Sequence, residues 1–158
     1  MDPSLQNNIM FIDPALLEKI ERGLWGVVQQ TRATAALLID RSGLVLAFVG
    51  DPPLHPSQMG AVAAGIFSAM NIIIKASRSG EFVVRVPETG ANLHFQHVDK
   101  GAFLCTFYAD PKEEARVREV VGKLATEARQ ALTQEQTTEH RVDNVNYITE
   151  KLNELFRD

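Results

Sequence analysis

The chain has 158 residues, which is enough for one domain with a substantial core and too few for two domains of usual size. Apolar residues make up 45% and charged residues 23% of the sequence, as in ordinary globular proteins. A net charge of −4 argues against a nucleic-acid-binding protein, because such proteins usually carry a basic stripe. Composition therefore indicates a single globular domain that binds neither DNA nor RNA.

Targeting signals and cysteine content favour the cytoplasm. Residues 1–12 lack the basic region and the long apolar run of a secretion signal. The most apolar segment, within 56–80, is interrupted by glycine, serine and asparagine and is too short to cross a bilayer. The single cysteine, Cys105, cannot form an internal disulfide, which fits a reducing compartment. We therefore expect a cytoplasmic protein without membrane insertion.

A helix and a β-hairpin are predicted in the first third of the chain. Asp13-Pro14 predicts a helix start, since aspartate can cap the first turn and proline needs no N–H donor there. Strands are predicted over 33–40 and 44–50, with Arg41-Ser42-Gly43 as the turn and its glycine free to adopt a positive φ. The prolines within 51–56 exclude regular structure, because they lack a donor and restrict their neighbours.

A central helix is predicted from Pro56 to Gly80, and its two sides differ. One side is apolar at steps of three and four residues and is predicted to face the core. It consists of Met59, Val62, Ala63, Ile66, Phe67, Met70, Ile73 and Ile74. The other side, built almost entirely from small residues, consists of Ala61, Ala64, Gly65, Ser68 and Ile72. A solvated helix face would carry long charged side chains instead. The small face is predicted either to contact another chain closely or to pack beneath another element of the same domain.

Three further strands are predicted over 81–87, 91–98 and 102–109. The turns between them end in glycine, and Asp110 opens a further helix through a pattern that resembles a capping box. Together the elements follow the order α-β-β-α-β-β-β-α, with one more helix at the C-terminus. A five-stranded antiparallel sheet with flanking helices covers every apolar face of these elements. We therefore predict an α/β fold of the α+β type.

Four segments are predicted along the chain: an N-terminal extension (1–12), the main domain (13–132), a polar connector (133–144) and an amphipathic helix (145–158). The apolar side of the last helix consists of Val145, Ile148, Leu152, Leu155 and Phe156. A helix this short is marginal alone in water. We therefore expect its apolar side either to dock in a partner's groove or to fold back on its own dimer.

Side chains that commonly catalyse reactions or bind metals are scattered through the sequence. His94 and His97 lie three residues apart on one predicted strand, so they point to opposite faces and cannot share a metal ion. The sequence has no glycine-rich phosphate loop, no dinucleotide fingerprint and no Gly-x-Ser-x-Gly motif. Arg41 is better explained as a solvated turn residue than as an arginine finger. The sequence predicts no metal, no cofactor and no catalytic residue, and it favours a binding protein over an enzyme.

Two stretches of sequence are similar to a known family. ALLIDRSGLVLAF, in the first hairpin, contains the pattern apolar-apolar-Asp-x-x-Gly-x-x-apolar, and AAGIFSAM follows on the central helix. Together with the order of elements, these stretches resemble the Roadblock/dynein light chain family, and within it the MglB-like bacterial regulators of MglA-type GTPases. The resemblance covers the chain from about Asp13 to Leu132.

The resemblance implies a homodimer in which the central helices pair and one strand edge joins the two sheets. It also implies that the small face presents Ala61, Ala64, Gly65, Ser68 and Ile72 to a small Ras-like GTPase. MglB-like proteins stimulate GTP hydrolysis by rearranging the GTPase's own residues, so a regulator of bacterial polarity or motility without its own active site is expected. Two alternatives stay open on the sequence: a Roadblock scaffold or adaptor that docks other proteins, and a small-molecule sensor that uses the sheet.

Overall fold

The computed structural model describes residues 13–74, 80–99 and 101–155, and their side chains except those of 74 and 133–148. The elements are α1 (Pro14–Gln30), β1 (Ala33–Asp40), β2 (Val45–Gly50), α2 (Pro56–Ile74), β3 (Glu81–Val86), β4 (Ala91–Asp99), β5 (Ala102–Tyr108), the 3₁₀ turn η2 (Pro111–Glu113) and α3 (Glu114–Leu155). This order agrees with the predicted one up to α3, whereas the separate last helix that was predicted is part of α3. No helix in the described part of the chain is both long and apolar enough to cross a membrane.

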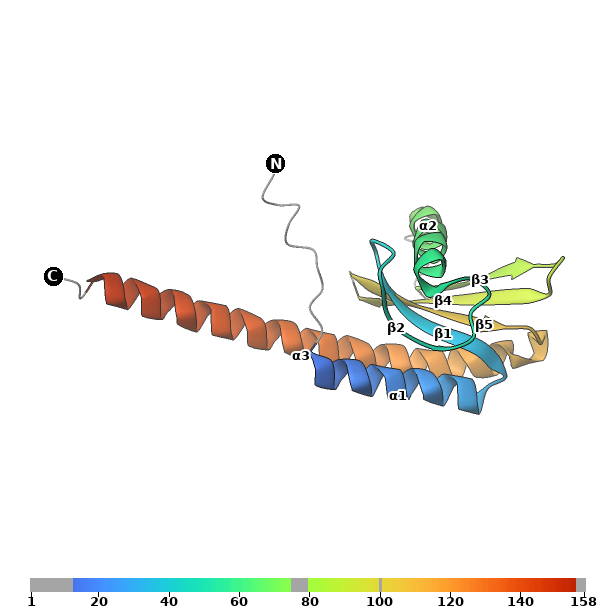
Figure 1. The fold of residues 1–158 in the computed structure, drawn as a ribbon, viewed down its shortest axis with the longest axis horizontal. Coiled ribbons are helices and arrows are strands. Elements are labelled where there is room, and N and C mark those ends of the chain that lie inside the picture. The colour runs from blue at the N-terminus through green and yellow to red at the C-terminus, as the bar shows by residue number, and fades with distance from the viewer. Residues whose placement is uncertain (1–12, 75–79, 100, 156–158) are drawn as a thin grey trace.

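The five strands form one antiparallel sheet in the order β2-β1-β5-β4-β3. Helix α2 lies on one face of this sheet, and α1 and α3 lie side by side on the other (Figure 1). Each face has its own apolar cluster, so the inner strands β1, β5 and β4 are buried on both sides for most of their length. The α+β prediction is confirmed, and the arrangement leaves the outer side of α2 as a surface of the domain.

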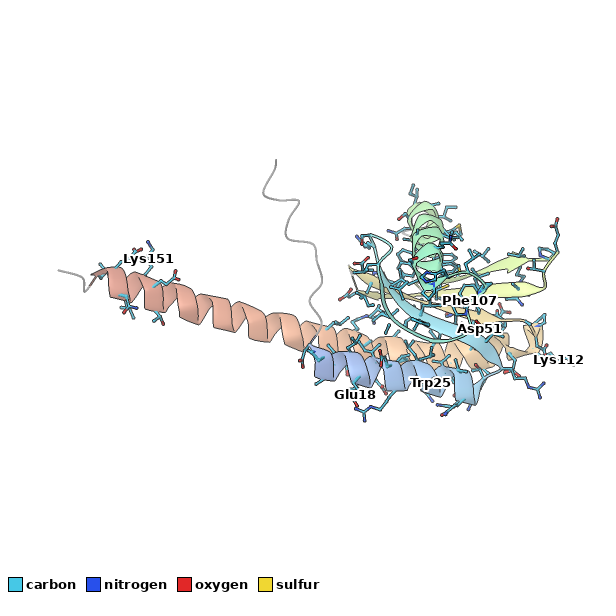
Figure 2. The ribbon with its side chains drawn as sticks, viewed as in Figure 1. Glu18, Trp25, Asp51, Phe107, Lys112 and Lys151 are labelled. Atoms are coloured by element: carbon cyan, nitrogen blue, oxygen red, sulfur yellow. The ribbon has the colours of Figure 1, made fainter. Side chains whose placement is uncertain are left out.

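The core beneath α2 is aromatic. Phe67 of α2 stacks on Phe103 of β5, with ring centroids 4.3 Å apart and planes within 3° of parallel. Phe82 of β3 stacks on Phe95 of β4 at 4.6 Å, and Phe107 of β5 lies in the same cluster (Figure 2). Offset aromatic stacking contributes about 0.5–1.5 kcal/mol per pair beyond the buried area. These contacts fix where α2 lies on the sheet.

The predicted starts of α1 and α2 are correct, whereas the predicted end of α2 falls beyond the described residues. Helix α1 begins at Pro14, with Asp13 at the N-cap position, although the Asp13 side chain makes no capping hydrogen bond. Helix α2 begins at Pro56 and is described as far as Ile74. The predicted end of this helix, at Gly80, follows residues 75–79, which lie outside the described part of the chain.

The expected connector over 133–144 is helical, because α3 continues without a break from Glu114 to Leu155. The prediction of a separate connector and terminal helix is therefore wrong at the level of secondary structure. The segment is polar, yet it contains no proline or glycine and includes good helix formers such as glutamine, glutamate and arginine. A segment without apolar residues cannot pack on the domain, but it can still continue a helix. Beyond Leu132, α3 runs past the sheet and past the start of α1 (Figure 1).

Candidate interaction surface

The most distinctive surface belongs to α2, whose 19 residues include no charged side chain. The helix packs on the sheet through Met59, Ala63 and Phe67, which are all buried. Its opposite side is exposed and consists of Ala61, Val62, Gly65, Ser68, Ala69, Ile72 and Ile73. We call this set the α2 face. An exposed helix side in a soluble protein is normally polar, so an uncharged face of this kind is typical of a contact surface.

Two isoleucines near the end of α2 dominate the apolar part of this face. Ile72 is 80% exposed and Ile73 is 65% exposed, and Val62, earlier on the same helix, is 45% exposed. Covering apolar surface contributes roughly 25 cal/mol per Å², so these side chains are available to stabilise a complex. In the described single chain these three side chains add no such burial energy, because no element covers them.

Four of the five residues predicted for the small face lie on the α2 face, namely Ala61, Gly65, Ser68 and Ile72. Ala64 does not: it is 8% exposed and belongs to the cluster beneath the helix. Position 64 lies at the boundary between the two sides, where the sheet can cover a side chain as short as alanine. Ala64 is therefore a core residue of this chain.

Val62 and Ile73 were predicted to face the core, and both are exposed. The helix meets the sheet along a strip centred on Ala63 and Phe67, so positions near 100° from that strip stay uncovered. These two residues and Ala69 extend the surface beyond the predicted set. The signal that could have identified them is the absence of charge over the whole helix, not only at the small residues.

Nothing within the described chain requires glycine at position 65. A Cβ added at this position would meet nothing within 4 Å. Glycine inside a helix costs about 1 kcal/mol relative to alanine, because the unfolded chain loses more conformational freedom. No contact within the described chain requires glycine at this position, so nothing there offsets the cost. A glycine would, however, let the backbone of a second chain approach α2 closely.

The β1–β2 hairpin is clamped against the start of the α2 face. A Cβ on Gly60 would lie 2.2 Å from the Gly43 carbonyl oxygen, so the two backbones touch and α2 needs glycine there. Gly43 itself has φ +93°, a conformation that favours glycine, as the turn prediction requires. The hairpin tip therefore has a fixed position beside Ala61, at the rim of the α2 face.

Asp40 holds the same turn in shape. Its Oδ1 accepts hydrogen bonds from the Ser42 backbone N–H at 2.9 Å, the Ser42 hydroxyl at 2.6 Å and the Leu44 N–H at 2.9 Å. The residue is only 6% exposed. Aspartate at this point of the pattern is thus explained by turn geometry, because its Oδ1 accepts all three of these hydrogen bonds.

Strand β3 forms one edge of the sheet and pairs only with β4. Its outer backbone groups therefore have no partner strand among the described residues. An unpaired edge of this kind can add a strand from another chain. Phe82 and Val84 are half-buried against the α2-side cluster, so the edge continues the apolar core to the border of the sheet.

Ionic contacts tie β3 to α3 on the opposite face. The Arg85 guanidinium donates to both carboxylate oxygens of Glu114 at 3.0 Å. Glu81 is shared between His94 Nε2, at 2.9 Å from Oε2, and Arg118 Nε, at 3.6 Å from Oε1. Burial lowers the pKa of His94 below its ordinary value of 6.5, although the hydrogen bond that its Nε2 makes to the Glu81 carboxylate acts in the other direction. His94 is therefore a neutral, fully buried residue of the fold.

His97 lies on the other face of the sheet, where its ring stacks on Phe67 at 6.2 Å. Desolvation, with Arg129 and Arg41 nearby, lowers the pKa of His97 as well. The prediction that the two histidines point to opposite faces is confirmed. Among the described residues no cluster of three or more His, Cys, Asp or Glu side chains could hold a metal ion.

Cys105 is completely buried, and burial raises its pKa far above the usual range of a thiol. A thiol that stays protonated and inaccessible is a poor nucleophile. The serines at the hairpin and on α2 also have local explanations: Ser42 bonds to Asp40, and Ser57 lies 2.9 Å from His55 Nδ1 at the start of the helix. The described residues thus offer a surface for contacts rather than a reactive site.

The predicted docking helix is the distal part of α3. Leu152 is 48% exposed and Leu155 is 78% exposed, at the end of α3 that Figure 2 marks with Lys151. The side chains of Val145 and Ile148 lie outside the described ones, as does Phe156 altogether. Whether the five residues form one stripe that binds a partner stays a prediction.

Several solved structures have a fold similar to that of this chain. No family model matches the sequence, and no curated protein sequence matches it either. A structure of MglB with a tetrameric arrangement is 20% identical with a TM-score of 0.71, covering 81% of this chain and 98% of the other. The gliding protein MglB from Thermus thermophilus is 24% identical with a TM-score of 0.66, covering 82% and 98%. A Roadblock/LC7 domain from Streptomyces avermitilis is 22% identical with a TM-score of 0.60, covering 72% and 97%.

At these identities the similarity establishes the fold. The chain therefore has the fold of Roadblock domains and of MglB, as its hairpin and central-helix motifs predicted. The near-complete coverage of the solved chains shows that no layer of that fold is missing here.

Proposed function

We propose that this protein is a cytoplasmic, homodimeric regulator that binds a small Ras-like GTPase of the MglA type and stimulates its GTP hydrolysis in a bacterial polarity or motility system. The observation that carries the proposal is the α2 face, which is uncharged, apolar and uncovered in the single chain. The Roadblock fold shared with MglB supports the same function.

Homodimerisation is supported by two features that lie where the resemblance implies contacts. Gly65 lets another helix approach α2 closely, and β3 offers an unpaired strand edge. Pairing two α2 faces would cover Ile72 and Ile73, which are otherwise the most exposed apolar side chains of the helix. Symmetric pairing of one surface with itself is the commonest way in which soluble chains assemble.

The GTPase is proposed to bind across the paired α2 faces, with the hairpin tip at their rim. Asp40 and the Gly43–Gly60 contact hold that tip rigid, which limits the entropy lost when a partner binds. Regulation would act through shape, by ordering the GTPase's own catalytic residues. In this mechanism the protein contributes no catalytic residue, cofactor or metal.

The direct test is a hydrolysis assay with a Ras-like GTPase of the MglA type. Sedimentation at micromolar concentration should give twice the mass of the chain, and GTP hydrolysis should accelerate when the protein is added. Ser68→Arg together with Ile72→Arg places two long charges on the α2 face, and desolvating them would cost several kcal/mol. We expect this double variant to lose GTPase binding.

A matched control keeps the added charge but moves it away from the surface. Gln29→Arg with Gln130→Arg adds two arginines at exposed positions on α1 and α3. This control should bind and stimulate like the parent. If the α2 variant stimulates hydrolysis as well as the control does, the assigned face is wrong. Binding without any change in the hydrolysis rate would favour a Roadblock scaffold instead.

A further inference from the structure

One residue of the sheet, His97 of β4, contacts three other elements at once. Its ring lies under α2, where it stacks on Phe67 with planes within 9° of parallel. Its backbone N–H donates to the Gly80 carbonyl oxygen at 2.9 Å, just before β3 begins. Its own carbonyl oxygen accepts a hydrogen bond from Arg129 Nη2 of α3 at 3.2 Å. His97 therefore joins α2, β3 and α3 near the end of β4.

Arg129 holds α3 to the sheet close to the point where α3 leaves the domain. Its Nε donates to the Val98 carbonyl oxygen, so the guanidinium bridges two consecutive carbonyl groups of β4. Arg129 comes three residues before Leu132, the last buried side chain in the described part of α3. Beyond Leu132, α3 runs past the sheet (Figure 1). We call residues 128–132 the α3 root, because the projecting part of the helix continues from them.

The charges around the His97 ring favour its neutral form. Desolvation lowers the pKa of His97 most, Arg129 and Arg41 lower it further, and Asp99 raises it. Arg41 is brought to this place by its backbone N–H, which donates to the Gly101 carbonyl oxygen at 3.2 Å. The Asp99 carboxylate already accepts a hydrogen bond from the Gly101 N–H at 2.8 Å. Two guanidinium groups from different elements therefore oppose a proton on the ring.

The other elements packed around His97 contribute no charge that would offset those two. Helix α2 carries no charged side chain. Glu81 of β3 lies on the opposite face of the sheet, where it contacts His94 and Arg118. Strand β5 places Phe103 opposite His97.

Of the groups around the ring, Arg129 is the one that can move when His97 gains a proton. A protonated ring can keep its stack on Phe67, because a cation over an aromatic face is attracted to it. The same proton makes His97 a cation beside the Arg129 guanidinium, and like charges repel. Arg129 is an exposed residue, so its guanidinium can leave the two carbonyl groups and become hydrated.

We propose that His97 is a pH-sensitive junction whose protonation releases Arg129 from the two β4 carbonyl groups and loosens the α3 root. With the neutral ring, α3 is fixed to the sheet, and the direction in which its projecting part leaves the domain is fixed as well. Because desolvation and the two guanidinium groups lower the pKa of His97, the release occurs below pH 6.5. This inference goes beyond the proposed function and does not depend on any partner.

NMR titration of His97 in the full-length protein gives the first test. Arg129→Met removes the nearer opposing charge, so the proton affinity of His97 should rise about three- to tenfold. The matched control is Arg116→Met, which removes an exposed cation of α3 that pairs with Glu119. Position 116 is 13 residues from Arg129, about 20 Å along the helix, so the control should leave the titration of His97 unchanged. An unchanged midpoint in Arg129→Met would overturn the junction.

Amide hydrogen exchange at the α3 root gives the second test, after correction for the intrinsic effect of pH on exchange. Coupling between two sites is reciprocal, so lowering the pH through the His97 midpoint should increase opening of residues 128–132 by about the same three- to tenfold factor. His97→Gln keeps the backbone carbonyl group but takes up no proton in this range, and its α3 root should show no such change.

The same experiment shows whether another group is responsible. His94 remains in the His97→Gln variant, so pH-dependent opening of the α3 root that persists there would overturn the proposal. Equal opening of the root at both ends of the pH range in the parent protein would overturn it too. If His97→Gln does not fold, His97→Phe replaces it, because phenylalanine keeps a ring under Phe67 without a titratable group.

Discussion

Adding one methyl group to α2 gives a sharp test of the proposed dimer. At Gly65 a new Cβ would meet nothing within 4 Å in this chain, and the same holds for Gly122 in α3. Replacing a glycine inside a helix by alanine where space is open stabilises the fold by about 0.5–1 kcal/mol. Gly65→Ala and Gly122→Ala should therefore stabilise the single chain to a similar extent.

The two variants should differ once chains associate. If two α2 helices approach closely at Gly65, the added methyl overpacks the contact at a cost of about 1–3 kcal/mol. Because a symmetric dimer contains two copies, the cost is at least about 2 kcal/mol, or roughly 30-fold in Kd. Gly122 lies on α3, away from the proposed interface, so Gly122→Ala should leave the Kd unchanged.

Sedimentation equilibrium over a range of concentrations measures both Kd values, and urea unfolding of the dilute protein measures the stability of the single chain. The expected result is a weaker dimer with a stabilised chain for Gly65→Ala, and an unchanged dimer with a stabilised chain for Gly122→Ala. Equal stabilisation and equal Kd for both variants would refute the close approach of α2 helices. The dimer would then have to use another surface.

Three further predictions concern the fold around the surface. Gly60→Ala should destabilise the protein by about 1–3 kcal/mol in thermal unfolding, because its Cβ would strike the Gly43 carbonyl oxygen; a stability equal to the parent's would contradict the clamp. Asp40→Ala should lose about 1–2 kcal/mol by removing the acceptor of three part-buried turn hydrogen bonds, while Asp40→Asn, which keeps an acceptor, should lose less. Burial lowers the pKa of His94 and of His97, so near pH 6.5 the unfolded chain binds protons that the folded chain does not. Stability should therefore fall as pH drops below about 6.5, by at most about 1.4 kcal/mol per pH unit from each histidine. His94→Gln should reduce this slope in pH-dependent melting, and an unchanged slope would show that another group is responsible.

Local pattern in the sequence determined the elements of this protein and much of its topology. Apolar runs bounded by turn residues marked the five strands, and the turn residues fixed the hairpins: Gly43 has the positive φ expected of it, and Asp40 closes its turn. The opposite faces of His94 and His97 follow from the two-residue period of a strand. These features depend on neighbours within a few residues, so the sequence alone carries enough information to predict them.

Tertiary structure decided which parts of each helix are covered, because coverage depends on how wide a strip the sheet presents. Ala64 is buried and Val62 is exposed, the reverse of the prediction, since α2 meets the sheet along a strip centred on Ala63 and Phe67. The continuity of α3 through 133–144 was also missed, because polarity was taken to interrupt a helix that only proline or glycine would have ended. The close contact of Gly60 with Gly43 joins a helix to a hairpin turn, and no local pattern encodes it. Periodicity gives the direction of a side chain, but only packing in three dimensions determines what it meets.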